Sequence, residues 1–176
     1  MTTIDTGIDP LNEDSVTHLS KYIVEGKYLN ALDYDQVLVG SLLIKKYFDF
    51  DTAGFSTLKV VNIGDKLRVT INGNQREVFV KGIVKSKVDE VSRKIFFVDS
   101  QLRGLLGRTD QNATEISVIL KPGSNPIDVK NALVANGFSE YAKIQTYAEG
   151  EPKFVKDLKN TFPLLPPITK CTTQHN

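Results

Sequence analysis

The chain has 176 residues, a formal net charge of +1 and a hydrophobic content of 40%. This length is enough for one medium domain or two small lobes with a core. The balanced charge argues against a nucleic-acid partner, because binding to phosphates needs a clustered excess of Lys and Arg. No secretory signal is evident, and no apolar run approaches the roughly 20 residues of a membrane span, so the sequence taken by itself predicts a soluble chain.

The first part of the chain is expected to contain a turn followed by a helix. Residues 7–10 (Gly-Ile-Asp-Pro) have the composition of an extended lead-in and a turn. A short helix is predicted over 14–24, with Asp14 or Ser15 as N-cap and Gly26 in the backbone conformation that ends a helix. The apolar positions of this helix are Val16, Leu19, Tyr22 and Ile23.

A buried strand is predicted over 37–39, and Gly40-Ser41 is expected to start a second helix. Gly-Ser between a strand and a helix also suggests a phosphate cradle. The chain has neither G-x-x-x-x-G-K-[ST] nor G-x-G-x-x-G, so a structural role is favoured. The acids around this region invite a metal interpretation, yet they lack the glycine and distal glutamate of a calcium loop. These acids, which we expect to be polar turn residues, are Asp33, Asp35, Asp49 and Asp51.

Two alternating runs separated by a Gly/Asn break predict an antiparallel hairpin over 66–84. An Asn-Gly turn would set Val69 opposite Arg76 on the core face. A Gly-Asn turn one residue later sets Val69 opposite Val78 and places glycine at the first central position, as a type II′ turn requires. The second register is therefore favoured.

A strand over 94–98 is predicted to lead directly into a short helix. Asp99 or Ser100 is expected to cap this helix at its N-terminus. Its apolar side would carry Leu102, Leu105 and Leu106.

A strand, a helix and a returning strand are predicted in the C-terminal third. Apolar and polar residues alternate over 115–121, and 142–147 is the returning strand. Between them Asn125 is a suitable N-cap, Pro126 takes the first helical position and Gly137 ends the helix. Such a unit implies a right-handed crossover between parallel strands in a sheet with one wetter face. This favours an α+β fold over a doubly wound sheet.

Several segments carry a family resemblance when they are taken in chain order. They are Gly7–Pro10, Glu25–Leu29, Gln36–Ser41, Gly64-Asp65 with Val80–Val84, and Ile116–Lys130. In this order they resemble the motifs of MacB-like periplasmic core domains, which are extracytoplasmic domains of ABC transporter permeases of the FtsX/MacB/Lol type. The sequence departs from the pattern at Leu43, Asp99 and Tyr147, where the family commonly has a small residue, Pro and Trp.

The resemblance implies an α+β fold with two lobes. An inserted, Sabre-like lobe with the β-hairpin would occupy 10–110, and the second half of a ferredoxin-like, Porter-like lobe would occupy 112–160. A helix beginning at Pro152 and an irregular tail over 161–176 would follow. The half lobe is expected to leave a strand edge exposed, which favours association. Structural roles are implied for seven motif residues, namely Gly26, Gly40, Gly64, Asp65, Gly82, Pro122 and Gly123.

The function that the resemblance implies is mechanical. The domain would lie at the extracytoplasmic face of the membrane and pass ATP-driven motion to a substrate or partner outside. Its partners would be the ABC ATPase subunit and the transmembrane part of the parent permease, together with an unidentified cargo or extracytoplasmic protein. ATP hydrolysis would belong to the separate nucleotide-binding subunit, so the domain itself is expected not to be an enzyme.

No catalytic, cofactor-binding or metal-binding residues are predicted. The two histidines are His18 and His175 and the single cysteine is Cys171, which is too little for a zinc site or a well-placed nucleophile and base. Nothing selects a catalytic pair among the 21 acids. Two alternatives stay open: a free-standing binding module, and a small hydrolase that uses carboxylates between the lobes.

Overall fold

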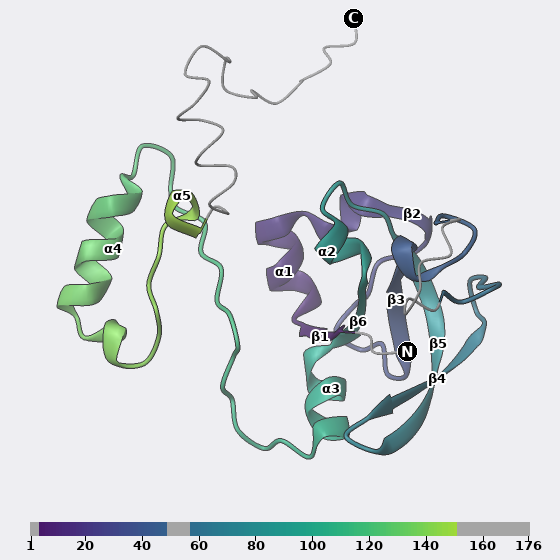
Figure 1. The fold of residues 1–176 in the computed structure, drawn as a ribbon. Coiled ribbons are helices and arrows are strands. Elements are labelled where there is room, and N and C mark those ends of the chain that lie inside the picture. Colours follow the sequence, from purple (N-terminus) through teal and green to yellow (C-terminus); the bar gives the residue numbers. More distant parts are fainter. Residues whose placement is uncertain (1–3, 49–56, 151–176) are drawn as a thin grey trace, which may run out of the picture. The chain divides into compact units, whose positions relative to one another are not determined.

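The computed structural model describes residues 4–48 and 57–150 (Figure 1). The chain divides into two compact units, Met1–Val118 and Ile119–Asn176. The mixed α+β class is as predicted. None of the described helices is long and apolar enough to cross a bilayer. The predicted helix from Pro152 and the tail over 161–176 lie outside the described residues, as do Asp49 and Asp51.

The N-terminal unit contains all the described strands, and the C-terminal unit contains three short helices. In the N-terminal unit the elements are β1 (Ile4–Ile8), α1 (Pro10–Thr17), η1 (Leu19–Tyr22), β2 (Ile23–Gly26), β3 (Gln36–Gly40), η2 (Ser41–Leu43), β4 (Lys66–Ile71), β5 (Asn74–Val84), α2 (Asp89–Ser92), β6 (Lys94–Val98) and α3 (Asp99–Leu106). In the C-terminal unit they are α4 (Pro126–Ala135), η3 (Phe138–Glu140) and α5 (Tyr147–Gly150).

The long strand β5 organises the sheet (Figure 1). The strand order is β1-β6-β3-β5-β2, and β4 also pairs with β5. Strand β3 is parallel to β5 and antiparallel to β6, while β1 is parallel to β6. Strand β4 pairs with residues 74–79 of β5 and β2 with residues 82–84, both antiparallel. Segments from distant parts of the chain therefore meet on one strand.

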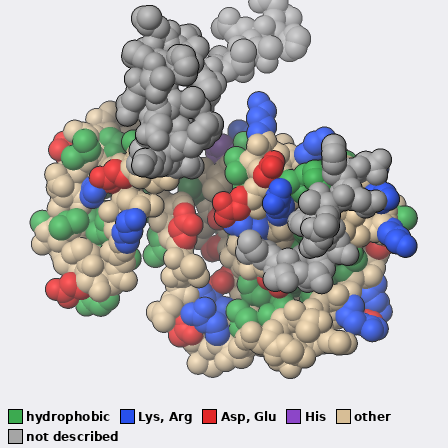
Figure 2. Space-filling model, in the orientation of Figure 1, with side chains coloured by type: hydrophobic (Ala, Val, Ile, Leu, Met, Phe, Trp, Pro, Cys, Tyr) green, Lys and Arg blue, Asp and Glu red, His purple; other side chains and the backbone are tan. Residues whose placement is uncertain are grey.

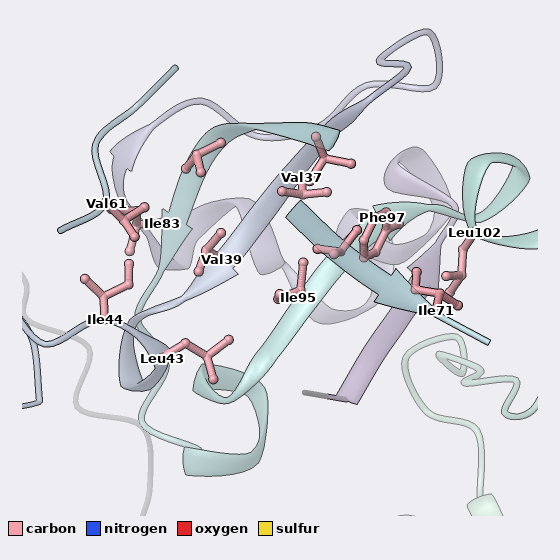
Figure 3. Packing of buried hydrophobic residues seen from close by; sticks show 13 residues of the cluster. Val37, Val39, Leu43, Ile44, Val61, Ile71, Ile83, Ile95, Phe97 and Leu102 are labelled. Carbon is pink, nitrogen blue, oxygen red and sulfur yellow. The ribbon is translucent and has the colours of Figure 1, made fainter. Parts of the chain in front are cut away.

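Both faces of the sheet are covered by apolar side chains. Successive residues of β3 and β6 belong to different buried clusters, because neighbouring side chains of a strand point to opposite faces. The first cluster, which includes Val37, Val39, Ile95 and Phe97, is seen in Figure 3. The second includes Leu38, Phe96 and Val98. The uninterrupted apolar runs in these strands follow from burial on both sides.

The hairpin forms, but the favoured register is wrong. Val69 lies opposite Arg76, and Asn72 and Gly73 form the two-residue turn with φ of +49° and +80°. Positive φ at both positions is the type I′ geometry, whose twist matches that of the flanking strands. Arg76 is tolerated opposite Val69 because its side chain is exposed and its guanidinium pairs with Asp35 at 3.0 Å.

The predicted helix over 14–24 is also wrong in its position. Helix α1 begins at Pro10 because Asp9 is its N-cap, with the carboxylate accepting hydrogen bonds from two backbone N–H groups of the first turn. The helix ends at Thr17, and His18 follows with a φ of +55°. Gly26 therefore ends the strand β2 and not a helix.

The helix predicted from Gly40-Ser41 is reduced to the three-residue 3-10 helix η2. Ile44 leaves it in an extended conformation, is fully buried and forms an isolated bridge with Leu58. Burial of Ile44 in the core thus prevents the longer helix. The predicted strand over 94–98 is confirmed as β6 and the Leu-rich helix as α3, although Val98 and not Asp99 or Ser100 is the N-cap residue.

The predicted helix of the C-terminal third is confirmed as α4, with Asn125 Oδ1 accepting from the N–H of Ile127 at 3.0 Å. The two predicted strands are wrong: neither 115–121 nor 142–147 belongs to a described ladder, and Tyr147 begins α5. A helix satisfies its own backbone, whereas a strand needs a neighbour. The described part of the chain supplies no neighbour to either segment.

Candidate functional site

Four of the seven motif residues lie together around the pairing of β2 with the end of β5. The register of β5 against β3 shifts there, because Val37 pairs with Val80 but the next residue, Leu38, pairs with Gly82. Lys81 is therefore an extra residue, which defines a β-bulge. Across the other side, Gly26 of β2 pairs with Gly82. We call Gly26, Gly64, Asp65, Lys81 and Gly82 the bulge junction.

Close approach of the backbones explains the two paired glycines. Gly26 has a φ of +82°, and a Cβ on it would overlap the carbonyl oxygen of Lys81 and lie 2.8 Å from the Cα of Gly82. A Cβ on Gly82 would lie 2.5 Å from the carbonyl oxygen of Lys27. A side chain at either position would push the two strands apart, so this pairing requires glycine.

The other two motif residues attach a turn to the same part of β5. The N–H of Gly64 donates to the carbonyl of Val80 at 2.8 Å, and the N–H of Val80 donates to the carbonyl of Asp65 at 2.9 Å. The Asp65 carboxylate also accepts from the N–H of Asn62 at 2.8 Å, which closes the turn. Gly64 and Asp65 thereby fasten the turn before β4 to Val80, which lies two residues before Gly82 on β5.

Ion pairs fasten the loop between β2 and β3 to β5. The Lys81 ammonium pairs with Asp33, and these side chains are only 15% and 10% exposed. The same carboxylate accepts from the N–H of Asn30 at 2.7 Å. Farther along β5, Arg76 pairs with Asp35, whose carbonyl accepts from the N–H of Phe79 at 2.7 Å. Asp33 and Asp35, considered as metal ligands in the sequence, are thus bound to cationic side chains.

A second polar cluster lies next to Gly26. Glu25 accepts hydrogen bonds from the Lys46 ammonium and the Tyr47 hydroxyl, and the Lys85 ammonium lies 5.9 Å from the centroid of the Tyr47 ring. The hydrogen bond from Lys46 lowers the pKa of Glu25, while burial and the bond to Glu25 raise the pKa of Tyr47. The cluster ties β2 to the chain that follows η2.

The point where the chain leaves α3 is also held by charged groups. Arg103, whose side chain is mostly buried, donates to the Asp99 carboxylate at 2.6 Å and to the carbonyls of Asp110 and Asn112 at 2.8 and 2.9 Å. Arg108 forms two bonds to the Asp110 carboxylate at 2.7 and 3.0 Å. We call Asp99, Arg103, Arg108, Asp110 and Asn112 the connector clamp.

The three remaining motif residues lie apart from the bulge junction. A Cβ on Gly40 would overlap the carbonyl of Ser92, so this glycine serves the close packing of β3 against α2. Pro122 and Gly123 form an exposed turn before α4, where Gly123 has a φ of +85° and the N–H of Ser124 donates to the carbonyl of Lys121. The residue type at each of these three positions is therefore explained by its local backbone structure.

Five of the described carboxylates are stabilised in their charged form. Asp14, Glu25, Glu77, Asp110 and Glu149 each have a pKa below the usual range, because each accepts hydrogen bonds from nearby cations or N–H groups. A catalytic acid needs the opposite shift. Within 4–48 and 57–150, no three His, Cys, Asp or Glu side chains group as metal ligands.

Sequence reasoning missed the ion pairs of both regions. Lys81 and Asp33 are 48 residues apart, so no local pattern connects them. The connector clamp had one local signal, because Asp99 and Arg103 are four residues apart and face each other on a helix. The bulge also had a signal, since the alternation of the second hairpin strand is disturbed at Ile83.

Comparison with known proteins gives no assignment: no family model matches the chain, and no curated protein matches it.

Proposed function

We propose that the chain is an extracytoplasmic domain of an ABC transporter permease of the FtsX/MacB/Lol type, which transmits ATP-driven motion to a substrate or partner outside the membrane. The observation that carries this proposal is the bulge junction. Gly26 comes from one motif of the resemblance, the Gly64-Asp65 pair and Gly82 come from the two ends of another, and all four residues meet at one place. Motif residues that serve one backbone geometry are expected to converge in this way.

A domain that transmits motion has to resist deformation, and two features of the N-terminal unit support this role. Its sheet is packed on both faces, and close-packed interiors transmit displacement with little compression. The connector clamp fixes residues 110 and 112 to α3, so a pull on the following chain would act directly on the helix. Arg103 supplies both of these bonds.

The partners in this proposal are the ABC ATPase and the transmembrane part of the parent permease. The cargo would be a lipoprotein, peptide or drug, or the output would be control of a cell-wall hydrolase. The domain itself would catalyse no reaction, because ATP hydrolysis would belong to the separate nucleotide-binding subunit. Its place would be the extracytoplasmic face of the membrane.

Labelling in intact cells tests the location. Leu32, which is almost fully exposed, is replaced by cysteine in a Cys171→Ser background of the native gene product. A membrane-impermeant maleimide should label this cysteine without lysis, while a cytoplasmic control protein should react only after lysis. Labelling of Leu32→Cys only after lysis would overturn the proposal.

Co-purification tests the partner. After chemical crosslinking of whole cells, the affinity-tagged native protein should carry an ABC ATPase with it, and a tagged unrelated membrane protein should not. Absence of an ATPase from the crosslinked material would contradict the permease assignment. It would favour a free-standing binding module, for which the exposed apolar side chains of the C-terminal unit are the supporting observation.

A further inference from the structure

The described part of the C-terminal unit has no buried residue. Every residue from 119 to 150 is at least partly exposed, and Ile127, Val134, Phe138 and Tyr141 are among the exposed large side chains. Figure 2 shows hydrophobic side chains at the surface of this unit. Ordering a chain costs conformational entropy that is normally offset by apolar burial. Residues 119–150 are therefore expected to gain burial from a further surface.

The segment 115–121, which joins the two units along the chain, is the most suitable contact. Its side chains alternate as in a strand, and Ile116 and Val118 are 79% and 68% exposed. Among the backbone hydrogen bonds of the described chain, none involves residues 115–120. A row of unpaired N–H and C=O groups beside apolar side chains is a template for another strand.

We infer that the occupant is a second copy of this chain, paired antiparallel through 115–121 about a two-fold axis at Val118. The charges of the segment are self-complementary in this register. Glu115 of each copy faces Lys121 of the other, and Ile116 faces Leu120. Residues directly opposite in an antiparallel pair share a face, so both copies place Ile116, Val118 and Leu120 on one apolar face.

Competing arrangements lack this complementarity. A parallel pairing in register would place Glu115 against Glu115 and Lys121 against Lys121, and like charges directly opposite are destabilising. The other exposed segment, 142–146, contains a single charged residue, Lys143, and offers no opposite charge for pairing with itself. The antiparallel pair also forms a closed, two-fold interface, the usual symmetry of homodimers. This inference does not depend on the permease proposal.

A charge exchange in the full 176-residue chain tests the register. Glu115→Lys places Lys opposite Lys twice in the dimer, and Lys121→Glu places Glu opposite Glu twice. Each variant alone should raise the dimer dissociation constant roughly thirtyfold in analytical ultracentrifugation. The double variant should restore dimerisation. A mixture of the two single variants should form a heterodimer, which also shows that both are folded.

Two controls make the outcome specific. Glu140→Lys and Lys143→Glu change the same charges at exposed positions outside the segment and should leave the dissociation constant unchanged. A wild-type chain that stays monomeric at all concentrations would overturn the inference. So would a dimer that is insensitive to the exchanges at 115 and 121, since another surface would then hold it.

Disulfide trapping tests the two-fold axis. In a Cys171→Ser background, Val118→Cys places two thiols directly opposite each other, with Cα atoms about 4.5–5.5 Å apart, within the range of a disulfide. Oxidation should link most of the protein into covalent dimers. Ile116→Cys is the matched control, because its copies would be about 13 Å apart along the strands. Equal crosslinking of both variants, or none at Val118→Cys, would contradict the register.

Discussion

The two units of the chain begin a helix in the same way but differ in what they bury. An Asx-Pro pair starts α1 (Asp9-Pro10) and α4 (Asn125-Pro126), with the side chain capping the first turn in both. In the N-terminal unit strands from distant segments then bury both faces of a sheet, whereas no described residue between 119 and 150 is buried. Helix starts are thus decided locally, but strands and cores depend on partners.

The largest expected effect comes from truncating one phenylalanine in each unit. Phe97 is fully buried in β6, whereas Phe138 in η3 is 54% exposed. Phe97→Ala should lower the free energy of unfolding by about 4 kcal/mol, because it removes a core side chain and leaves a cavity. Phe138→Ala should cost well under 1 kcal/mol. Urea unfolding followed by circular dichroism measures both.

An equal loss of unfolding free energy in the two phenylalanine variants would contradict the contrast between a buried and an exposed unit. It would mean that Phe138 is covered in solution. Repeating the measurement at low and high protein concentration then separates burial within one chain from burial between copies, because only the second depends on concentration.

Two glycines with positive φ provide the next test. Gly26 (φ +82°) lies against the backbone of β5, whereas Gly123 (φ +85°) has open space around the position of a Cβ. Gly123→Ala should cost about 1 kcal/mol for the left-handed conformation alone. Gly26→Ala should cost about 3 kcal/mol or more, since a methyl group also forces β2 from β5. Thermal unfolding of the two variants measures the difference in stability between them. Similar losses of stability would show that the backbone around Gly26 moves apart at little energetic cost.

The sequence predicts those parts of the fold that are specified within a few residues. The hairpin, β6, α3 and α4 belong to this group, because alternation, caps and turn residues lie inside each element. Strand β1 does not, since Ile4 pairs with Lys94, ninety residues away. The turn was misassigned because type II′ chemistry at Gly73-Asn74 and type I′ chemistry at Asn72-Gly73 compete, and both turn types match the strand twist, so the sequence does not separate them.

In the candidate site, too, some features could be predicted from the sequence and others could not. Gly26, Gly64, Asp65 and Gly82 were identified as structural from motif order, although their meeting at one bulge could not be foreseen. The partner of Lys81 was hidden, because Asp33 lies 48 residues earlier in the chain and only the return of β5 beside the loop after β2 brings the two together. Long-range pairings of this kind are set by topology, which a single sequence does not display.

One ion pair in each unit gives a third comparison, with a smaller expected change in the free energy of unfolding. Lys81 and Asp33 are mostly buried in the N-terminal unit, while Lys130 and Glu149 pair at 2.6 Å at the surface of the C-terminal unit. Lys81→Met should destabilise the chain by about 2 kcal/mol, because the Asp33 charge loses its partner in a partly buried place. Lys130→Met should have little effect, as is usual for exposed pairs. A large loss for Lys130→Met in urea unfolding would contradict the exposed character of the C-terminal unit.

The smallest effect concerns the acid dependence of stability. The bond from Arg108 lowers the pKa of Asp110 to about 2, and the bond from Lys130 lowers that of Glu149 to about 2, from ordinary values of 3.8 and 4.5. A carboxyl with a depressed pKa in the folded state stabilises it above the ordinary pKa, and this contribution is lost as the pH falls towards 2. Asp110→Asn should therefore flatten the fall in stability between about pH 4 and pH 2.

The acid dependence can be assigned to one unit by NMR. The amide signals of β6 are followed during urea unfolding at pH 5 and at pH 2.5. Asp110 belongs to the connector clamp on α3, so Asp110→Asn should reduce the difference between the two pH values. Glu149→Gln should leave the β6 signals unchanged, because no described residue of the unit that contains Glu149 belongs to the buried clusters around β6. If instead Glu149→Gln flattens the β6 response, the two units unfold together, and the contrast between a self-sufficient unit and a dependent one would fail.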